Sequence, residues 1–354
     1  MNEILTNQIF LDTSIFIKEN FFLGKKLNAF LKHSKSQDIE LVITEITIKE
    51  VISNIDRFAH EANVALKNSL KEFDTKLKIF KNIDSLSPLF EIKNTFNYDN
   101  EVKKLKEKFT SLVDEYFTII QIDSNQTTKI INDYFNSLPP FKDGKKKNEF
   151  PDAFVLNSLE SYCKTKKIKM YVVSGDEDIL SYKSDFLLPI REYENLLSQI
   201  SYTFSDKNML PKVNQIITEN KEEIIERINE EFLNNFPTVG YQEYSGFQYE
   251  VDDVEVVSTY IDYHYVIYFF NNIASTELRV SIKYIVSVTT EDSSMGVYDK
   301  EDNKWYNIET ITNNYEIDSA LIVMIDVEID LPGKDILSKK WDFKEISNGI
   351  PKNL

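Results

Sequence analysis

Gln8-Ile9-Phe10-Leu11-Asp12-Thr13-Ser14 is a short apolar run that ends at an acidic residue, and it indicates the fold of the first half of the chain. Such a run is typical of a strand buried inside a sheet. Similar runs occupy residues 39–43 and 169–174, and a shorter one covers residues 187–190. We therefore predict four buried strands within the first 200 residues.

Segments with helical periodicity separate these strands. They cover residues 19–34, 44 or 47 to about 82, 98–123, 126–138, 151–166 and 192–200. Thr47 and Glu50 have the spacing of a capping box, so we expect the long second helix to start between Thr44 and Thr47 and to form a projecting hairpin. The alternation predicts an α/β fold, a parallel sheet with helices on both faces. Right-handed crossovers align the carboxyl ends of the strands along one ligand-binding edge.

The pattern changes after residue 204. Residues 211–236 form one amphipathic helical segment, and residues 260–270, 278–288 and 321–329 alternate apolar and polar side chains as strands do. This order predicts a smaller α+β domain with an antiparallel sheet. We expect a first domain over residues 1–204, with a helical insertion at 57–140, and a second domain over residues 205–354.

Charge is distributed unevenly between these parts. The 354 residues carry a net charge of −17, but residues 1–200 account for only −2 of it and residues 201–354 for −15. An acidic total argues against binding to nucleic acid, whose backbone attracts positive charge. That argument applies to the second part of the chain and not to the first.

The composition also limits the kinds of site and the cellular location that we expect. The single cysteine, Cys163, excludes an internal disulfide framework and a cysteine-rich zinc site. No apolar run reaches the roughly 18 residues of a membrane span, and the first residues lack the basic region of a signal peptide. We expect a cytoplasmic protein that does not enter the membrane.

Acidic residues fall where the predicted layout brings the strand ends together. They are Asp12 after the first strand, Glu50 in the helix after the second, Asp152 in the first turn of a later helix, and Asp176 with Asp178 after the third strand. Singly, such acids also serve helix dipoles and turns. Jointly they repel one another unless a cation compensates them, which predicts a site for Mg²⁺ or Mn²⁺.

Four motifs resemble those of PIN-domain nucleases. They are Ile9-Phe10-Leu11-Asp12-Thr13-Ser14, the stretch from Ile43 to Val51, Phe150-Pro151-Asp152-Ala153, and Val172-Val173-Ser174-Gly175-Asp176-Glu177-Asp178. The similarity is to a bacterial PIN-like group with a lysine-rich stretch before a Phe-Pro-Asp-Ala motif. It covers residues 5 to about 200, apart from the insertion, and implies a flavodoxin-like sandwich.

The resemblance implies a metal-dependent ribonuclease that leaves 5′-phosphate and 3′-hydroxyl ends. Its core ligands for one or two ions are Asp12, Glu50, Asp152 and Asp176. Asp178, Thr13, Ser14 and Ser174 are auxiliary, and Glu45 is the weaker alternative to Glu50. Bound ions of this kind activate water for in-line attack on a phosphodiester. The basic residues Lys142, Lys145, Lys146 and Lys147 precede Asp152 and are either phosphate contacts for RNA or single-stranded DNA, or a solvated loop.

Two other interpretations remain at this stage. A phosphatase of the haloacid dehalogenase type also has an Asp after its first strand, but its motif requires a second Asp where this chain has Ser14. A non-catalytic scaffold would bind metal structurally while the acidic domain recruits a protein partner or forms a homo-oligomer. For a nuclease, a role in bacterial defence or stress response fits the two-domain organisation by analogy.

Overall fold

The computed structural model describes residues 3–85, 97–141, 149–204, 209–236, 239–241, 248–270, 272–292, 296–301, 304–306, 309–329 and 341–347. The chain divides into two compact units, residues 3–196 and residues 197–354, within helix α9 (Tyr193–Phe204). The predicted domain boundary after residue 204 lies at the end of the same helix and stays a prediction.

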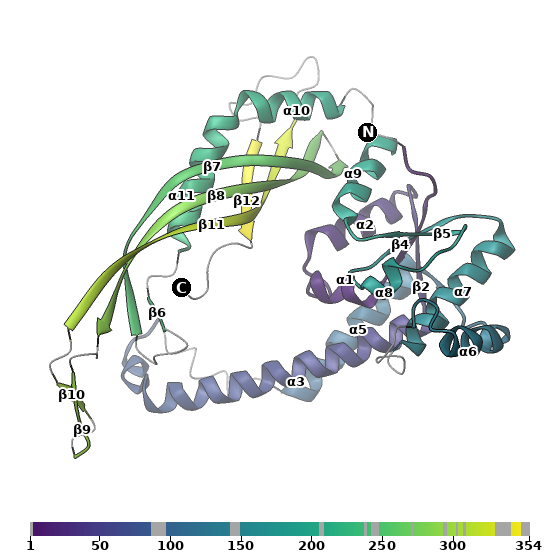
Figure 1. The fold of residues 1–354 in the computed structure, drawn as a ribbon. Coiled ribbons are helices and arrows are strands. Elements are labelled where there is room, and N and C mark those ends of the chain that lie inside the picture. Colours follow the sequence, from purple (N-terminus) through teal and green to yellow (C-terminus); the bar gives the residue numbers. More distant parts are fainter. Residues whose placement is uncertain are drawn as a thin grey trace. The chain divides into compact units, whose positions relative to one another are not determined.

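A five-stranded parallel sheet forms the centre of the first unit (Figure 1); the sequence predicted the parallel sheet but only four of its strands. Its order is β3-β2-β1-β4-β5. The strands are β1 (Gln8–Leu11), β2 (Glu40–Thr44), β3 (Phe117–Ile120), β4 (Met170–Val173) and β5 (Leu187–Ile190). Strand order reverses between β1 and β4, so the chain leaves these neighbours in opposite directions and opens a crevice at their carboxyl ends.

Helices connect and cover these strands. They are α1 (Thr13–Lys18), α2 (Lys25–Lys35), α3 (Glu45–Thr75), the 3₁₀ helix η1 (Lys78–Asn82), α5 (Tyr98–Tyr116), the 3₁₀ helix η2 (Ser124–Gln126), α6 (Thr127–Phe135), α7 (Phe150–Lys166) and α8 (Glu177–Leu180). Helix α7 buries Leu156 and Leu159 against Phe10 and Val172 of the sheet. Elsewhere in the unit Phe16 of α1 packs edge to face on Phe109 of α5, with ring centroids 5.5 Å apart.

The long helix starts within the predicted range, between Thr44 and Thr47, but ends earlier than predicted. Helix α3 begins after Thr44, whose side chain accepts a hydrogen bond from the Thr47 backbone N–H at 3.1 Å, so the capping residue is Thr44 and not Thr47. The helix ends at Thr75, not near residue 82. The insertion at 57–140 is also not helical throughout, because β3 within it pairs in parallel with β2.

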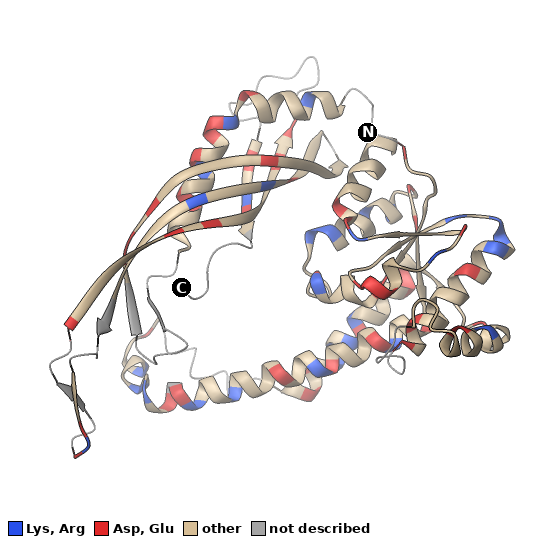
Figure 2. Ribbon diagram, in the orientation of Figure 1, with Lys and Arg blue, Asp and Glu red and all other residues tan. Residues whose placement is uncertain are grey.

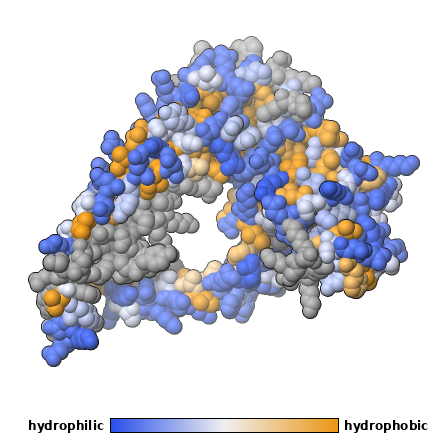
Figure 3. Space-filling view, in the orientation of Figure 1, coloured by the Kyte–Doolittle hydropathy of each residue, from blue (hydrophilic) through white to orange (hydrophobic). Residues whose placement is uncertain are grey.

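The second unit contains an antiparallel sheet of order β12-β11-β8-β7-β6. Its strands are β6 (Val239–Tyr241), β7 (Gln248–Phe270), β8 (Ile273–Asp292), β11 (Glu309–Glu328) and β12 (Trp341–Ser347), and β9 (Val297–Asp299) pairs separately with β10 (Lys304–Tyr306). This confirms the predicted antiparallel α+β arrangement. In the space-filling view, hydrophobic patches interrupt a mainly hydrophilic surface over both units (Figure 3).

The helical segment predicted as one helix over residues 211–236 is two helices. They are α10 (Met209–Glu219) and α11 (Lys221–Asn234), separated at Asn220. Their apolar residues Val213, Ile228 and Phe232 join one buried cluster with the sheet, in which Phe232 lies 4.9 Å from Tyr284 between ring centroids. The sheet therefore buries one face against these helices.

Strand β7 shifts register against β8 at regular intervals. The shifts follow Val251, Val256, Ile261 and Val266, so one extra residue of β7 is inserted every five residues. Two of the extra residues are aspartates: Asp252 accepts a hydrogen bond from Thr289 at 2.7 Å, and Asp262 accepts one from Ser281 at 2.6 Å. Such β-bulges bend a strand and increase its twist.

Candidate active site

Asp12 lies where β1 ends, next to the end of β4. Its backbone N–H donates to the carbonyl of Val173 at 3.0 Å, which continues the pairing of the two strands by one residue. Its side chain then accepts from the Ser14 backbone N–H at 3.2 Å and caps the short helix α1. The chain therefore turns from strand to helix at this acid, which is 8% exposed.

Two serine hydroxyls, one after β1 and one after β4, donate hydrogen bonds to the Asp12 carboxylate. Ser14 donates to Asp12 Oδ2 at 2.6 Å, and the fully buried Ser174 donates to the same oxygen at 2.9 Å. Each hydroxyl also accepts a backbone N–H, Ser14 from Gly175 and Ser174 from Asp176, both at 3.0 Å. This network joins the ends of β1 and β4 across the crevice.

Asp176 and Asp178 lie on the turn that follows this network. The exposed Asp176 caps α8, and its Oδ1 accepts from the Asp178 backbone N–H at 2.8 Å. Helix α8 has only four residues, so the cap positions the turn more than it stabilises a helix. Both carboxylates belong to the carboxyl edge of the sheet.

Glu50 reaches the site from the second turn of α3. Thr13, the residue after Asp12, donates from Oγ1 to Glu50 Oε2 at 2.8 Å. Burial raises the pKa of Glu50, the Thr13 hydrogen bond lowers it, and the charge of Asp12 raises it further. Glu50 is thus the α3 carboxylate held beside Asp12, whereas Glu45 lies in the first turn of the helix.

Asp152 shows most clearly that the carboxylates converge. It lies in the first turn of α7 beside Pro151, which is compatible with a helix start because proline lacks the N–H that this turn leaves unpaired. The pKa of Asp152 is raised to about 8, first by burial and then by four neighbouring negative charges. They belong to Asp12, Glu50, Asp176 and Asp178.

Four acids therefore lie close enough to Asp152 for their negative charges to act on it. Across the described ranges, no three or more His, Cys, Asp or Glu side chains form a cluster already spaced to hold a metal ion. The donor set is nevertheless suited to a divalent cation, because it consists of hard carboxylate oxygens whose repulsion a cation relieves. Without a cation, the raised pKa of Asp152 means that a proton reduces the repulsion instead.

The structure does not test the predicted lysine contacts. Lys142, Lys145, Lys146 and Lys147 lie outside the described residues, so their role stays a prediction. The lysines of α5 alternate with acids along the helix pair (Figure 2), and they form ion pairs with Asp56, Glu101 and Glu107. These α5 lysines therefore lie on a solvated helix surface, where acids are their partners.

Sequence reasoning missed an aromatic cluster at the start of α7. Tyr134, Phe141 and Phe150 have ring centroids 5.0 to 5.5 Å apart, and Phe135 extends the group from Tyr134 at 5.3 Å. The available signal was the pair of aromatics before Pro139-Pro140 and the phenylalanines on either side of the lysines. Only their packing shows that the four rings form one group.

We expect Ser174→Ala to lower the free energy of unfolding by about 2 kcal/mol. The change removes a buried donor to the Asp12 carboxylate and leaves the Asp176 backbone N–H without this acceptor. Chemical denaturation followed by circular dichroism measures the loss. The exposed helical Ser53→Ala is the matched control, and equal stability of both variants would contradict the structural role of Ser174.

Comparison with known families agrees with this arrangement. Residues 9–179 match the model of a PIN domain family, a range that includes all five acids. This part of the chain is a PIN domain. Searches of curated proteins and of solved structures found no match to the chain. PIN domains are generally nucleases that use divalent metal ions and act on nucleic acids, and the match does not extend to the second unit.

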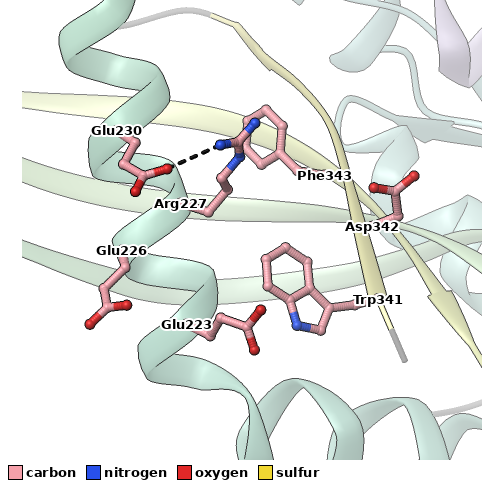
Figure 4. A pocket seen from close by; sticks show the side chains of 7 residues that line it. All are labelled: Glu223, Glu226, Arg227, Glu230, Trp341, Asp342 and Phe343. Carbon is pink, nitrogen blue, oxygen red and sulfur yellow. Dashed lines mark hydrogen bonds and ion pairs between the residues drawn. The ribbon is translucent and has the colours of Figure 1, made fainter. Parts of the chain in front are cut away.

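A separate pocket of about 390 Å³ lies in the second unit, outside the PIN domain. Figure 4 shows it between α11 and β12, with acidic side chains and an indole around it. Arg227 is paired with Glu230 at 3.0 Å and with Glu231 at 2.6 Å. The lining residues are Glu223, Glu226, Arg227, Glu230, Trp341, Asp342 and Phe343. Acids outnumber the single arginine, so the pocket is electronegative.

Among the helices that the structure describes, none combines the length and the apolar character needed to cross a membrane.

Proposed function

We propose that this protein is a divalent-metal-dependent endoribonuclease that leaves 5′-phosphate and 3′-hydroxyl ends. The observation that carries the proposal is the convergence of acids on Asp152, whose pKa rises to about 8 at the carboxyl edge of a PIN-domain sheet. Repulsion between close carboxylates lowers the stability of the fold, and a bound cation compensates their charge. A cation site therefore accounts for the placement of these acids.

Asp12, Asp152 and Asp176 are the proposed ligands of one Mg²⁺ or Mn²⁺ ion. Glu50, with Asp12 or Asp178, holds a second ion or orients the attacking water. When bound, such an ion activates water and stabilises the oxygens of the phosphodiester during in-line displacement. The serine hydroxyls on Asp12 Oδ2 fix the direction of that carboxylate, and Thr13 does the same for Glu50.

The direct test uses the purified chain with labelled RNA, single-stranded DNA and flap substrates, each with Mg²⁺ and with Mn²⁺. We expect cleavage of RNA and ends that carry 5′-phosphate. If neither RNA nor DNA is cut, the alternative of a non-catalytic metal-binding scaffold replaces the nuclease. A phosphoryl group covalently attached to Asp12 would instead support the haloacid dehalogenase type of phosphatase, which the PIN-domain match disfavours.

For the biological role we propose bacterial defence or stress response, in the cytoplasm, with the second unit as the interaction or control module. What supports this division is the charge of the second part of the chain and its electronegative pocket. A basic protein partner, or a second copy with a basic surface, is the ligand chemistry that such a pocket favours.

Charge reversal tests the role of the pocket. We expect the wild-type chain to bind an oligolysine peptide in low salt and the double variant Glu223→Lys/Glu226→Lys to bind it at least tenfold more weakly, because both carboxylates line the pocket. Fluorescence anisotropy measures the binding. Glu309→Lys, an exposed acid on β11, is the control for net charge, and equal weakening by both changes would exclude a specific site.

A further inference from the structure

The aromatic cluster at the start of α7 extends to an exposed ring on α6. Phe135 and its support Tyr134 are called the aromatic ledge below. Phe135 is 75% exposed, although three neighbouring aromatic rings are partly or fully buried. Tyr134 supports it, because the Tyr134 ring packs edge to face on Phe141 and lies 5.0 Å from Phe150 between centroids. The exposed ring is thus attached to an ordered support and does not stand alone on the surface.

This ledge is continuous with the candidate active site. Phe150 of the cluster and Asp152 of the site share the first turn of α7, and the next residue, Ala153, packs with Ile130 of α6. Helices α6 and α7 lie side by side (Figure 1), with the end of α6 next to the start of α7. The exposed ring of Phe135 is therefore linked, through Tyr134 and Phe150, to the helical turn that carries Asp152.

The basic residues that adjoin the aromatic cluster in sequence favour a nucleic acid over an apolar protein segment. The four lysines of the sequence motif lie between Phe141 and Phe150, and these two flanking rings are in contact at 5.0 Å. The four lysines are therefore close in sequence to two rings of the aromatic cluster. Basic residues that follow a backbone, combined with an aromatic face for bases, make up the usual platform for single strands.

We propose that Phe135, supported by Tyr134, is a nucleobase-stacking residue that holds one unpaired base of the RNA strand whose phosphodiester lies at the carboxylates. The inference rests on the proposed ribonuclease function and adds a subsite built by α6, in the insertion that the family motifs do not cover. An aromatic face accepts any base, so this contact increases affinity without reading sequence.

The test compares Phe135→Leu, Phe135→Trp and the wild-type chain on one short labelled oligoribonucleotide and on copies that lack a single base at successive positions. Phe135→Leu keeps apolar volume and removes stacking, so we expect kcat/KM to fall about tenfold, mainly through KM. Phe135→Trp is expected to restore the wild-type value. Ile79→Ala removes an equally exposed apolar residue on η1 and is expected to change nothing.

The abasic substrates identify the contact itself. At one position, loss of the base is expected to slow the wild-type chain about tenfold and to have no further effect on Phe135→Leu, because both changes remove the same interaction. Undiminished cleavage by Phe135→Leu, or additive losses at every position, overturns the stacking role while leaving the nuclease intact. Since Phe135 is exposed, unchanged melting temperatures are expected in all variants.

A wild-type chain that cuts no RNA would refute the proposed function separately. In that case the same oligonucleotides are used in a binding measurement with Mn²⁺. Weaker binding of one abasic copy by the wild type, and not by Phe135→Leu, still supports the stacking subsite. Equal binding of all copies refutes it.

Discussion

Asp12→Asn is expected to reduce Mn²⁺-dependent RNA cleavage about a thousandfold or more, because the carboxylate at the centre of the site loses its charge. The fold is expected to persist. Asparagine also caps helices, and its side-chain oxygen still accepts the hydrogen bonds that Ser14 and Ser174 donate to Asp12. Cleavage rates measured over a range of Mn²⁺ concentrations, with circular dichroism as the check on folding, give the result.

Asp185→Asn is the matched control for this change. Asp185 is an exposed aspartate that precedes β5, so it belongs to the opposite edge of the parallel sheet from Asp12. It should retain wild-type activity. Substantial cleavage by a folded Asp12→Asn chain would show that the nuclease centre does not depend on the strand-end carboxylates.

The second large effect concerns pH and metal together. In the metal-free protein, the pKa of Asp152 is about 8 in the folded state and near its ordinary value of 3.8 when the chain unfolds. Between these values the folded state holds a proton that the unfolded state has lost, so the free energy of unfolding falls as pH rises toward 8. We expect Asp152→Asn, which cannot ionise, to remove about 2 kcal/mol of this fall between pH 6 and pH 9, after allowing for solvent screening.

Addition of metal distinguishes the ionisation of Asp152 from a stabilising effect of the substitution that is unrelated to the site. Mn²⁺ is expected to raise the melting temperature of the wild-type chain at pH 8 by binding the folded state, and to do much less for Asp152→Asn. Chemical denaturation at pH 6 and pH 9 with chelator, and then with Mn²⁺, provides both comparisons. Parallel pH profiles for the two proteins would show that the acids do not interact with Asp152 as described.

The sequence was sufficient to predict the parallel sheet because its interior strands are continuous apolar runs. Asp12 and Ser174 follow two such runs directly, which is why their positions at one sheet edge could be foreseen. The structure brings them together, but their role as a metal site stays a prediction. What no pattern could supply was the degree of convergence at Asp152, since this depends on how α3 and α7 pack against the strand ends.

The missed elements are those whose local pattern resembles a neighbouring one. Strand β3 follows α5 without an intervening turn residue, so in the sequence its four residues look like a continuation of the helix. Only the pairing with β2 identifies them as a strand. Ile217 and Ile224 are seven residues apart, close to two helical turns, and this spacing hides the break at Asn220.

Strand β12 was missed for a related reason. Trp341 and Phe343 alternate as strand residues do, but a register shift opposite Met324 moves the next apolar position to Ile346. A period of two is then interrupted within seven residues. Pairing with the preceding strand β11 identifies these residues as a strand.

The repeated bulges of β7 also limit how the second unit can assemble. Among the described residues, β6 pairs only with Gln248–Glu250, which leaves most of β7 as an outer strand of considerable length. A straight outer strand is a template for joining sheets between molecules, and an insertion every five residues prevents a straight partner from keeping its pairing. Copies of this chain should therefore resist fibre-like sheet extension, and any specific assembly should use side-chain surfaces instead of backbone pairing.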